Sequence, residues 1–203
     1  MKYYKNLLAL MAMSFVVTTA MSQKLTKDER KKALDHLQTT QEELVKTVEG
    51  LSEAQLNFTP NEEGWSVAMC VEHIALSENS IFGIVQMTLQ NEPDPSLRDS
   101  VSMSDDQVIG LITNRSQKVK TREEFEPTGK FGSYQGSLDE FKKKRESNKV
   151  YVKNTKDDLR NRYFDFPFGK VDAYQVILFM SGHTQRHTDQ IKEVMATEGF
   201  PTE

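Results

Sequence analysis

The sequence predicts an all-α protein, a four-helix bundle with short additional helical turns. Three observations support this fold class. Apolar residues recur at helical spacing over four long stretches of the chain. Residues that favour helix N-termini precede most of these stretches, and glycine and proline separate them. No sustained alternation of apolar and polar residues, the pattern of a half-buried strand, is evident.

The N-terminal segment is typical of an export signal. Lys2 and Lys5 give it a basic start, and an apolar run follows over residues 7–20. Small residues then occupy the −3 and −1 positions of a cleavage site before Gln23. The alternative is an N-terminal membrane anchor, although the apolar run is short for a membrane span.

Length and composition predict one domain after this signal. We expect residues 1–22 to be a signal peptide and residues 23–203 to form a helical-bundle domain that is periplasmic or secreted, without stable membrane insertion. With 26 basic and 30 acidic side chains, the chain has no charge excess suited to nucleic acid. A small-molecule substrate is the expected partner, and a homodimer is left open. Cys70 is the only cysteine, so no intrachain disulfide forms, and we expect it to be buried.

The first long helix is predicted over residues 23–50, where Gly50 ends it. His36 falls beside its apolar stripe, and we expect this histidine to be partly exposed. A connector follows, in which Ser52 begins a capped short turn. We expect Trp65 to pack at the end of the bundle, with a place in a pocket wall as the alternative.

The second long helix is predicted from its N-cap, Ser66, to about Gln90. His73 lies at the edge of the apolar stripe of this helix, in line with small and polar residues. Such neighbours favour a cavity wall over a tightly packed core, although the serines could instead mark a solvent-facing flank. The aligned residues are Ser66, Cys70, Ser77 and Ser80.

Two capping boxes predict the next helices. A shorter third helix is expected from Ser104 to about Arg122, and a fourth from Ser137 to about Arg160. Between them, the glycine-rich residues 123–136 are expected to form an ordered loop over the end of the bundle. Their glycines do not match a phosphate-binding pattern. The basic run Lys142–Arg145 is expected to be a solvated helix face.

The last helix, from Asp172 to about Glu198, carries the most informative motif. Its apolar stripe, continued at helical spacing, passes through His183 and His187, so both should point toward the core. Histidines four residues apart on a helix share one face, about 6 Å apart at Cβ. That spacing allows two imidazoles to bind one metal ion. An aromatic connector over residues 162–171 precedes this helix.

A metal site explains this pair better than a hydrated helix face does, which is the alternative. A buried histidine needs a hydrogen-bond partner or a metal, and no carboxylate lies beside the pair in the stripe. Gln190 follows His187 by one turn and could orient a ligand ring or a bound water.

Three motifs occur together in this chain. They are Trp65-Ser66 followed by His73, the connector Phe166–Gly169, and His183-x3-His187-x2-Gln190-Ile191 with a closing Gly199-Phe200-Pro201. Together they resemble the DinB-like superfamily of helical-bundle proteins over essentially the whole mature chain. The resemblance implies an up-down-down-up bundle. It also implies one divalent metal ion, zinc or nickel, held by His73, His183 and His187.

The resemblance also bears on activity, because many members of this superfamily look like metal-dependent hydrolases and others like thiol-dependent transferases or isomerases. Three neutral imidazoles leave a coordination position open for water, which favours hydrolysis of a small substrate. The export signal disfavours the thiol-dependent role, since such thiols are mainly cytosolic. A non-catalytic, metal-stabilised ligand-binding bundle is the third hypothesis. No general acid or base can be named, because Glu72, Glu78 and Asp189 should point away from the histidines.

Overall fold

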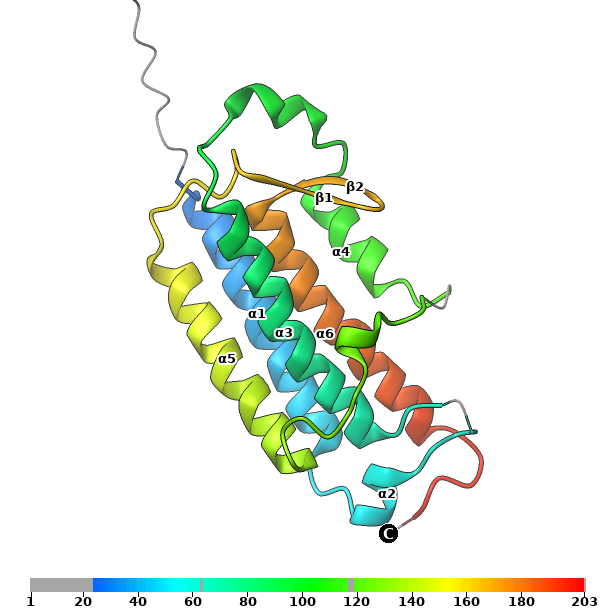
Figure 1. Ribbon diagram of the computed structural model, residues 1–203. Coiled ribbons are helices and arrows are strands. Elements are labelled where there is room, and N and C mark those ends of the chain that lie inside the picture. The colour runs from blue at the N-terminus through cyan, green and yellow to red at the C-terminus, as the bar shows by residue number, and fades with distance from the viewer. Residues whose placement is uncertain (1–23, 63, 117–118, 203) are drawn as a thin grey trace, which may run out of the picture.

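The structure is a computed structural model that describes residues 24–62, 64–116 and 119–202, so the predicted signal peptide, residues 1–22, lies outside the described residues. The four long helices of the bundle are α1 (Lys27–Val48), α3 (Val67–Thr88), α5 (Tyr134–Asn154) and α6 (Ala173–Met195). Figure 1 shows α1 and α6 running in one direction and α3 and α5 in the other. This is the predicted up-down-down-up bundle.

Shorter elements connect the long helices. They are α2 (Glu53–Asn57), the 3-10 helix η1 (Pro95–Ser100), α4 (Asp105–Thr113), the 3-10 helix η2 (Glu123–Phe125), and the strands β1 (Tyr163–Phe166) and β2 (Gly169–Asp172). Helix α6 packs against α1, α3 and α4, whereas α5 packs against α1 and α3. In the described part of the chain, no helix combines the length and apolar character that a membrane crossing requires.

The predicted helix starts at Ser52, Ser66, Ser104 and Asp172 are confirmed. Each of these side chains accepts a hydrogen bond from the backbone N–H three residues ahead. The side chain of that residue in turn accepts the backbone N–H of the capping residue, which completes a capping box. The residues that satisfy the free N–H groups of the first turn are thus local in sequence, which is why the sequence predicts these starts well.

The third helix is shorter than predicted, because α4 ends at Thr113 rather than near Arg122. Asn114 follows in an extended conformation, and its Oδ1 accepts the N–H of Ser116 at 2.9 Å. Arg186 of α6 donates to the carbonyl oxygens of Ile112 and Asn114, which satisfies the open end of α4. A distant arginine therefore helps to satisfy the end of α4, and this contact does not show in the local pattern.

The fourth helix was also misplaced, since α5 begins at Tyr134 and ends at Asn154. Its N-cap is Ser133, whose Oγ accepts the N–H of Gly136 at 3.0 Å, so the predicted cap Ser137 lies inside the helix. A Cβ at Gly136 would lie 2.3 Å from the carbonyl oxygen of Phe131. Gly136 is therefore a close-packing residue of the first turn, whereas the sequence pattern suggested a loop glycine.

The aromatic connector contains a β-hairpin that the sequence analysis did not predict. Strands β1 and β2 pair antiparallel, with Tyr163 opposite Asp172 and Phe166 opposite Gly169. Each strand has four residues, which is too short to establish an alternating pattern. The hairpin lies across the end of the bundle where α6 begins (Figure 1).

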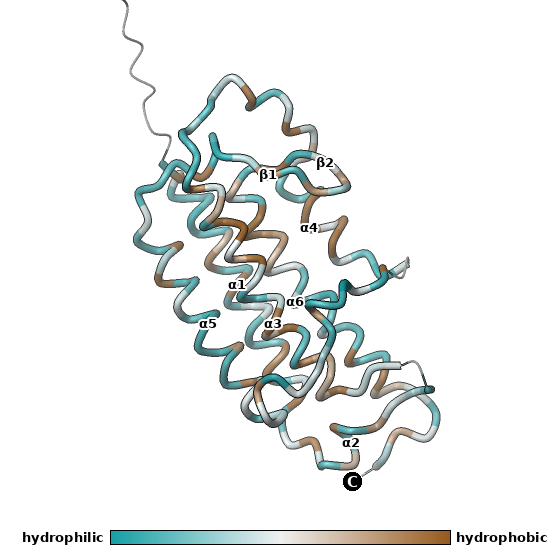
Figure 2. Tube along the Cα trace, in the orientation of Figure 1, coloured by the Kyte–Doolittle hydropathy of each residue, from teal (hydrophilic) through white to brown (hydrophobic). Residues whose placement is uncertain are grey.

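The core consists of two apolar clusters separated by a polar layer, the buried and hydrogen-bonded polar side chains around Arg145. One cluster lies toward the hairpin and includes Leu37, Val152 and Ile177, and the other lies toward α2 and includes Leu44 and Phe141. Figure 2 shows the hydrophobic stretches on α3, α4 and α6, while α5 is largely hydrophilic.

The predicted solvated face Lys142–Arg145 needs correction at its last residue. Lys143 is exposed, but Arg145 is fully buried in the polar layer. Its guanidinium donates two hydrogen bonds of 2.8 Å to the carboxylate of Glu78 on α3. It also donates to Thr40 of α1 at 2.8 Å and to Thr184 of α6 at 2.7 Å. One side chain thus links all four long helices.

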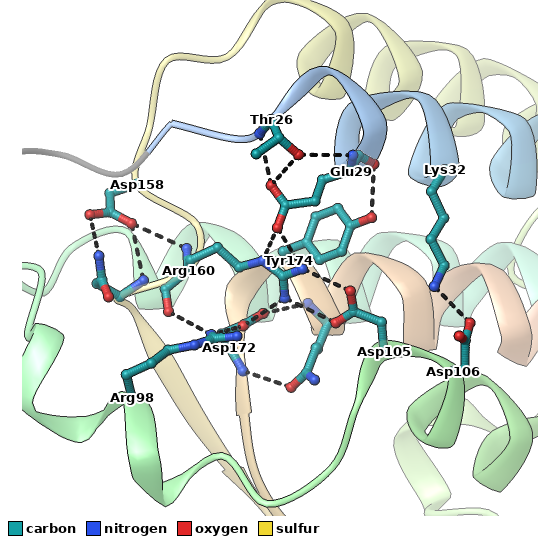
Figure 3. Close-up of polar contacts among 12 residues, drawn as sticks. Thr26, Glu29, Lys32, Arg98, Asp105, Asp106, Asp158, Arg160, Asp172 and Tyr174 are labelled. Atoms are coloured by element: carbon teal, nitrogen blue, oxygen red, sulfur yellow. Dashed lines mark hydrogen bonds and ion pairs between the residues drawn. The ribbon is translucent and has the colours of Figure 1, made fainter.

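A second charged cluster holds the hairpin end of the bundle. Arg160 donates to Glu29 at the start of α1, to Asp105 of α4 and to Asp172, which caps α6, with distances of 2.7–2.9 Å (Figure 3). Arg98 also donates to Asp172. These bonds tie the starts of α1, α4 and α6 together. The N-terminal end of α6, the helix that carries His183 and His187, is therefore held in place.

Candidate metal centre

The structure brings the three predicted histidines together. His73 lies on α3, and His183 and His187 lie one turn apart on α6. One ring nitrogen of each lies within 4.8 Å of the corresponding nitrogens of the other two. The ring centroids are 4.3 Å apart for His73 and His187, and 4.5 Å apart for His183 and His187. In the described part of the chain, this is the group of three whose geometry could hold one ion.

A backbone carbonyl fixes the orientation of His73. Its Nδ1 lies 2.8 Å from the carbonyl oxygen of Phe125, at the end of η2. Because a carbonyl oxygen can only accept, Nδ1 carries the proton and Nε2 keeps its lone pair. The hydroxyl of Ser77 lies 3.4 Å from Nε2. His73 thus presents the nitrogen that a metal requires.

Gln190 does the same for His187. Its Oε1 lies 2.8 Å from Nδ1 of His187, so Nδ1–H donates a hydrogen bond to the amide oxygen and Nε2 is left free. The three-residue spacing on α6 places the amide directly beside the ring. An outer partner of this kind orients a metal-binding histidine and increases its basicity.

Burial keeps the cluster neutral. Burial lowers the pKa of His183 and His187 well below the ordinary value of 6.5, and the neighbouring histidines lower it further. Burial also lowers the pKa of His73, although the hydrogen bond to Phe125 acts in the opposite direction. At neutral pH all three rings are therefore unprotonated at one nitrogen, which is the state that binds metal.

Trp65 forms part of the wall of this site. Its ring centroid lies 4.9 Å from that of His73, and it stacks on His187 at 6.2 Å. Trp65 also packs against the apolar cluster at the α2 end of the bundle. The predicted packing of Trp65 at the end of the bundle is confirmed, and its ring also contacts two of the three histidines.

On the other side, aromatic rings lead from the hairpin to His183. Phe166 and Phe168 both stack on Phe179, at 4.9 and 5.6 Å, and Phe179 lies 6.4 Å from His183. These four side chains are partly exposed. Helix α4 adjoins the same region, because a Cβ at Gly182 would lie 2.5 Å from Cγ2 of Ile112. The hairpin and α4 therefore shape the surroundings of His183.

His36 does not join the cluster. It is partly exposed, as predicted, and its Nδ1 lies 2.6 Å from Oγ of Ser181. Burial lowers its pKa, and the positive charges of Arg145 and Lys32 lower it further. Its contacts thus lead to the polar layer and not to the candidate ligands.

The nearby carboxylates are engaged elsewhere. Glu78 pairs with Arg145, and Asp189 accepts hydrogen bonds from Gln185 and Lys192. Glu72, which precedes His73, accepts hydrogen bonds from three backbone N–H groups of residues 128–130. The prediction that these carboxylates point away from the histidines agrees with these contacts. The role of Glu72 in holding residues 128–130, and the carbonyl of Phe125, were not predicted, because backbone partners leave no residue-type signal.

Comparison with known proteins agrees with this architecture. Residues 36–191 match the family model described as the DinB superfamily. The uncharacterized protein YuaE of Bacillus subtilis (strain 168) is 25% identical over 149 residues, which cover 72% of this chain and 87% of that protein.

A solved structure also matches. YfiT from Bacillus subtilis has a TM-score of 0.57 and 16% sequence identity, and the match covers 88% of this chain and 93% of YfiT. YfiT is described as a probable metal-dependent hydrolase with an unusual four-helix bundle topology. At this level of identity the match shows a shared fold.

Proposed function

The chain belongs to the DinB superfamily, and from this membership and the three-histidine cluster we propose that it is a metal-dependent hydrolase of a small substrate. The description of YfiT, which shares the fold, supports this proposal. The observation that carries it is the convergence of His73, His183 and His187, with their ring nitrogens within 4.8 Å of one another.

The donor set fits a divalent ion such as zinc or nickel. His73, His183 and His187 would hold the ion, and Gln190 and the carbonyl of Phe125 keep protons on the outer nitrogens of two of these rings. When bound, an ion with three histidine ligands and an open position supplies Lewis acidity, which activates water and polarises the attacked group. Trp65 covers the rings of His73 and His187 and limits access of solvent from that side.

One observation favours a second candidate, a non-catalytic metal-stabilised module that binds a ligand. Glu72, Glu78 and Asp189 are all occupied by partners within the protein. A hydrolase of this kind would therefore need a proton-transfer group other than these three carboxylates. The thiol-dependent transferase is the other alternative, and it predicts activity only with an added low-molecular-weight thiol.

The test combines metal analysis with substrate profiling. Elemental analysis of the full chain, purified without a histidine tag, should find about one divalent ion per chain. A panel of ester, amide and phosphoester substrates is then assayed with the metal-loaded protein, with chelated protein and with the His187→Ala variant. Turnover by the loaded protein alone supports the hydrolase. Turnover only with an added thiol selects the transferase, and ligand binding without turnover selects the module.

We also propose that the protein is exported and acts in the periplasm or outside the cell. The basic, apolar and small-residue order of residues 1–22 supports this proposal. N-terminal sequencing of the exported protein should give a start near Gln23. An intact Met1 on the exported protein would contradict cleavage and favour the membrane anchor.

A further inference from the structure

Two adjacent residues of α3 hold a single segment of chain over the candidate metal centre. Glu72 accepts the N–H groups of Thr128 at 3.1 Å, Gly129 at 3.0 Å and Lys130 at 2.7 Å. The next residue, His73, donates its Nδ1 proton to the carbonyl of Phe125. We call residues 125–130 the strap.

Backbone N–H groups of the strap bind the carboxylate of Glu72 as an anion. Glu72 as a residue is 7% exposed, and three successive N–H groups converge on its carboxylate. Gly129 has a φ of +79°, a conformation that glycine adopts without strain and that aims the N–H groups in this way. Thr128, Gly129 and Lys130 are themselves exposed, so the carboxylate is the anchor that holds this part of the strap on the bundle.

We propose that Glu72 is a positioning residue for the metal centre, because it fixes the strap and thereby the tautomer of His73. This inference rests on the proposed metal-binding function. With the strap in place, the carbonyl of Phe125 keeps the proton on Nδ1, and Nε2 is free to bind the ion. Glu72 is not one of the three residues that would hold the ion, so it would act only through Phe125.

The competing tautomer has a ready partner. Oγ of Ser77 lies 3.4 Å from Nε2 of His73 and can accept a hydrogen bond from an Nε2–H group. If the strap moves away, the hydrogen bond that selects Nδ1–H is lost, and the Nε2–H form becomes accessible. That form carries its proton on the nitrogen that should bind the metal, so metal affinity falls.

Glu72→Gln tests this mechanism with little change in shape. The remaining oxygen of the amide can still accept from Thr128 and Lys130, but the new NH₂ group then faces the N–H of Gly129. Glu124→Gln is the matched control, because Glu124 lies just before the strap, is exposed, and has an ion pair with Arg122 at 3.9 Å.

A second pair consists of a variant that weakens the strap without changing α3 and a control outside the strap. Gly129→Ala places a side chain at a φ of +79°, with no atom within 4 Å of the new Cβ, so its effect is backbone strain. Gly50→Ala introduces the same strain, at a φ of +73° and again without a clash, at the end of α1. Circular dichroism and thermal melting establish that each variant is folded.

The deciding measurement is the ¹⁵N chemical shift of the two ring nitrogens of His73 in the metal-free protein. We expect the Nδ1–H form to predominate in the wild type and in both controls, and the Nε2–H form to increase in Glu72→Gln and Gly129→Ala. Titration with Zn²⁺ should then show an affinity about tenfold lower in these two variants than in their controls.

The outcomes separate this inference from the proposed function. An unchanged tautomer in both folded variants would overturn the positioning role, and Glu72 would then hold the loop without tuning the histidine. A changed tautomer with unchanged Zn²⁺ affinity would also overturn it. If the wild type binds no Zn²⁺, the proposed function fails, and the tautomer measurement still shows whether Glu72 controls His73.

Discussion

The guanidinium of Arg145 and the carboxylate of Glu78 form a two-point ion pair in the centre of the bundle, with both N···O distances at 2.8 Å and both side chains fully buried. The remaining N–H groups of Arg145 donate to the backbone carbonyl of Leu37 and to the side-chain hydroxyls of Thr40 and Thr184. Asn148 donates a further hydrogen bond to Glu78 at 2.8 Å. The charges are thus paired and their hydrogen-bonding capacity is largely used, as a buried pair requires.

Removing one partner of this pair should destabilise the protein strongly. In Glu78→Ala the guanidinium of Arg145 remains buried without its counter-charge, and we expect the free energy of unfolding to fall by about 3–5 kcal/mol. Urea denaturation followed by circular dichroism measures this change.

Lys143→Ala is the matched control, since Lys143 lies in the same basic run but is exposed. Its effect should stay within about 0.5 kcal/mol. If the free energy of unfolding fell by less than about 1 kcal/mol in Glu78→Ala, water would reach Arg145, and the ion pair would not be shielded from solvent.

The sequence predicted the features that depend on local patterns. The capping boxes at Ser104 and Asp172 mark the starts of α4 and α6, and the apolar stripe on α6 leads to His187, which is buried, and to His183, which is partly exposed. The features it missed are set by distant partners. Arg186 binds the open end of α4, and Glu78 pairs with Arg145 in the core, although Arg145 stands in a run of lysines. Charge alone does not distinguish a buried arginine from a solvated one.

The same distinction applies to the candidate site. The spacing of His183 and His187 and the position of Gln190 follow from helix geometry, so the sequence placed them correctly. The contribution of His73 came from the family resemblance, since pairing between helices is not a local property. The carbonyl of Phe125 could not be predicted at all, because every residue carries a carbonyl and only the fold brings this one to His73.

His36 should titrate below its ordinary pKa of 6.5, because burial and the charges of Arg145 and Lys32 disfavour its protonated form. As the pH falls below 6.5, the unfolded chain binds a proton at His36 before the native protein does, so native stability decreases. The stabilising contribution is therefore present above pH 6.5 and is lost as the pH falls. An NMR titration of the His36 ring measures the midpoint directly.

His36→Asn is the control for this effect. Between about pH 7.5 and 5, its unfolding free energy should fall less than that of the wild type, because the titrating group is gone. A midpoint at or above 6.5 in the wild type would mean that His36 is hydrated or paired with a negative charge.

Gln190 should contribute to metal affinity through His187. In Gln190→Ala the Nδ1 proton of His187 loses its acceptor, and we expect Zn²⁺ to bind about 10–100-fold more weakly. Gln190→Glu keeps an acceptor at the same place and should retain most of the affinity. Gln185→Ala is the control, since Gln185 binds Asp189 on the same helix. Equal affinities in Gln190→Ala and Gln185→Ala would exclude an orienting role for Gln190.

His73, His183 and His187 should bind one divalent ion jointly, so His187→Ala should reduce the bound metal strongly. Most of the helix content should remain, because the two apolar clusters hold the bundle on either side of the polar layer. His36→Ala should keep its metal, since His36 contacts Ser181 and lies outside the cluster. Elemental analysis and circular dichroism of both variants test this together. Full metal content in His187→Ala with loss in His36→Ala would show that the site lies elsewhere. If no single histidine substitution changed the metal content, the three histidines would be core or surface residues of a bundle whose function lies elsewhere.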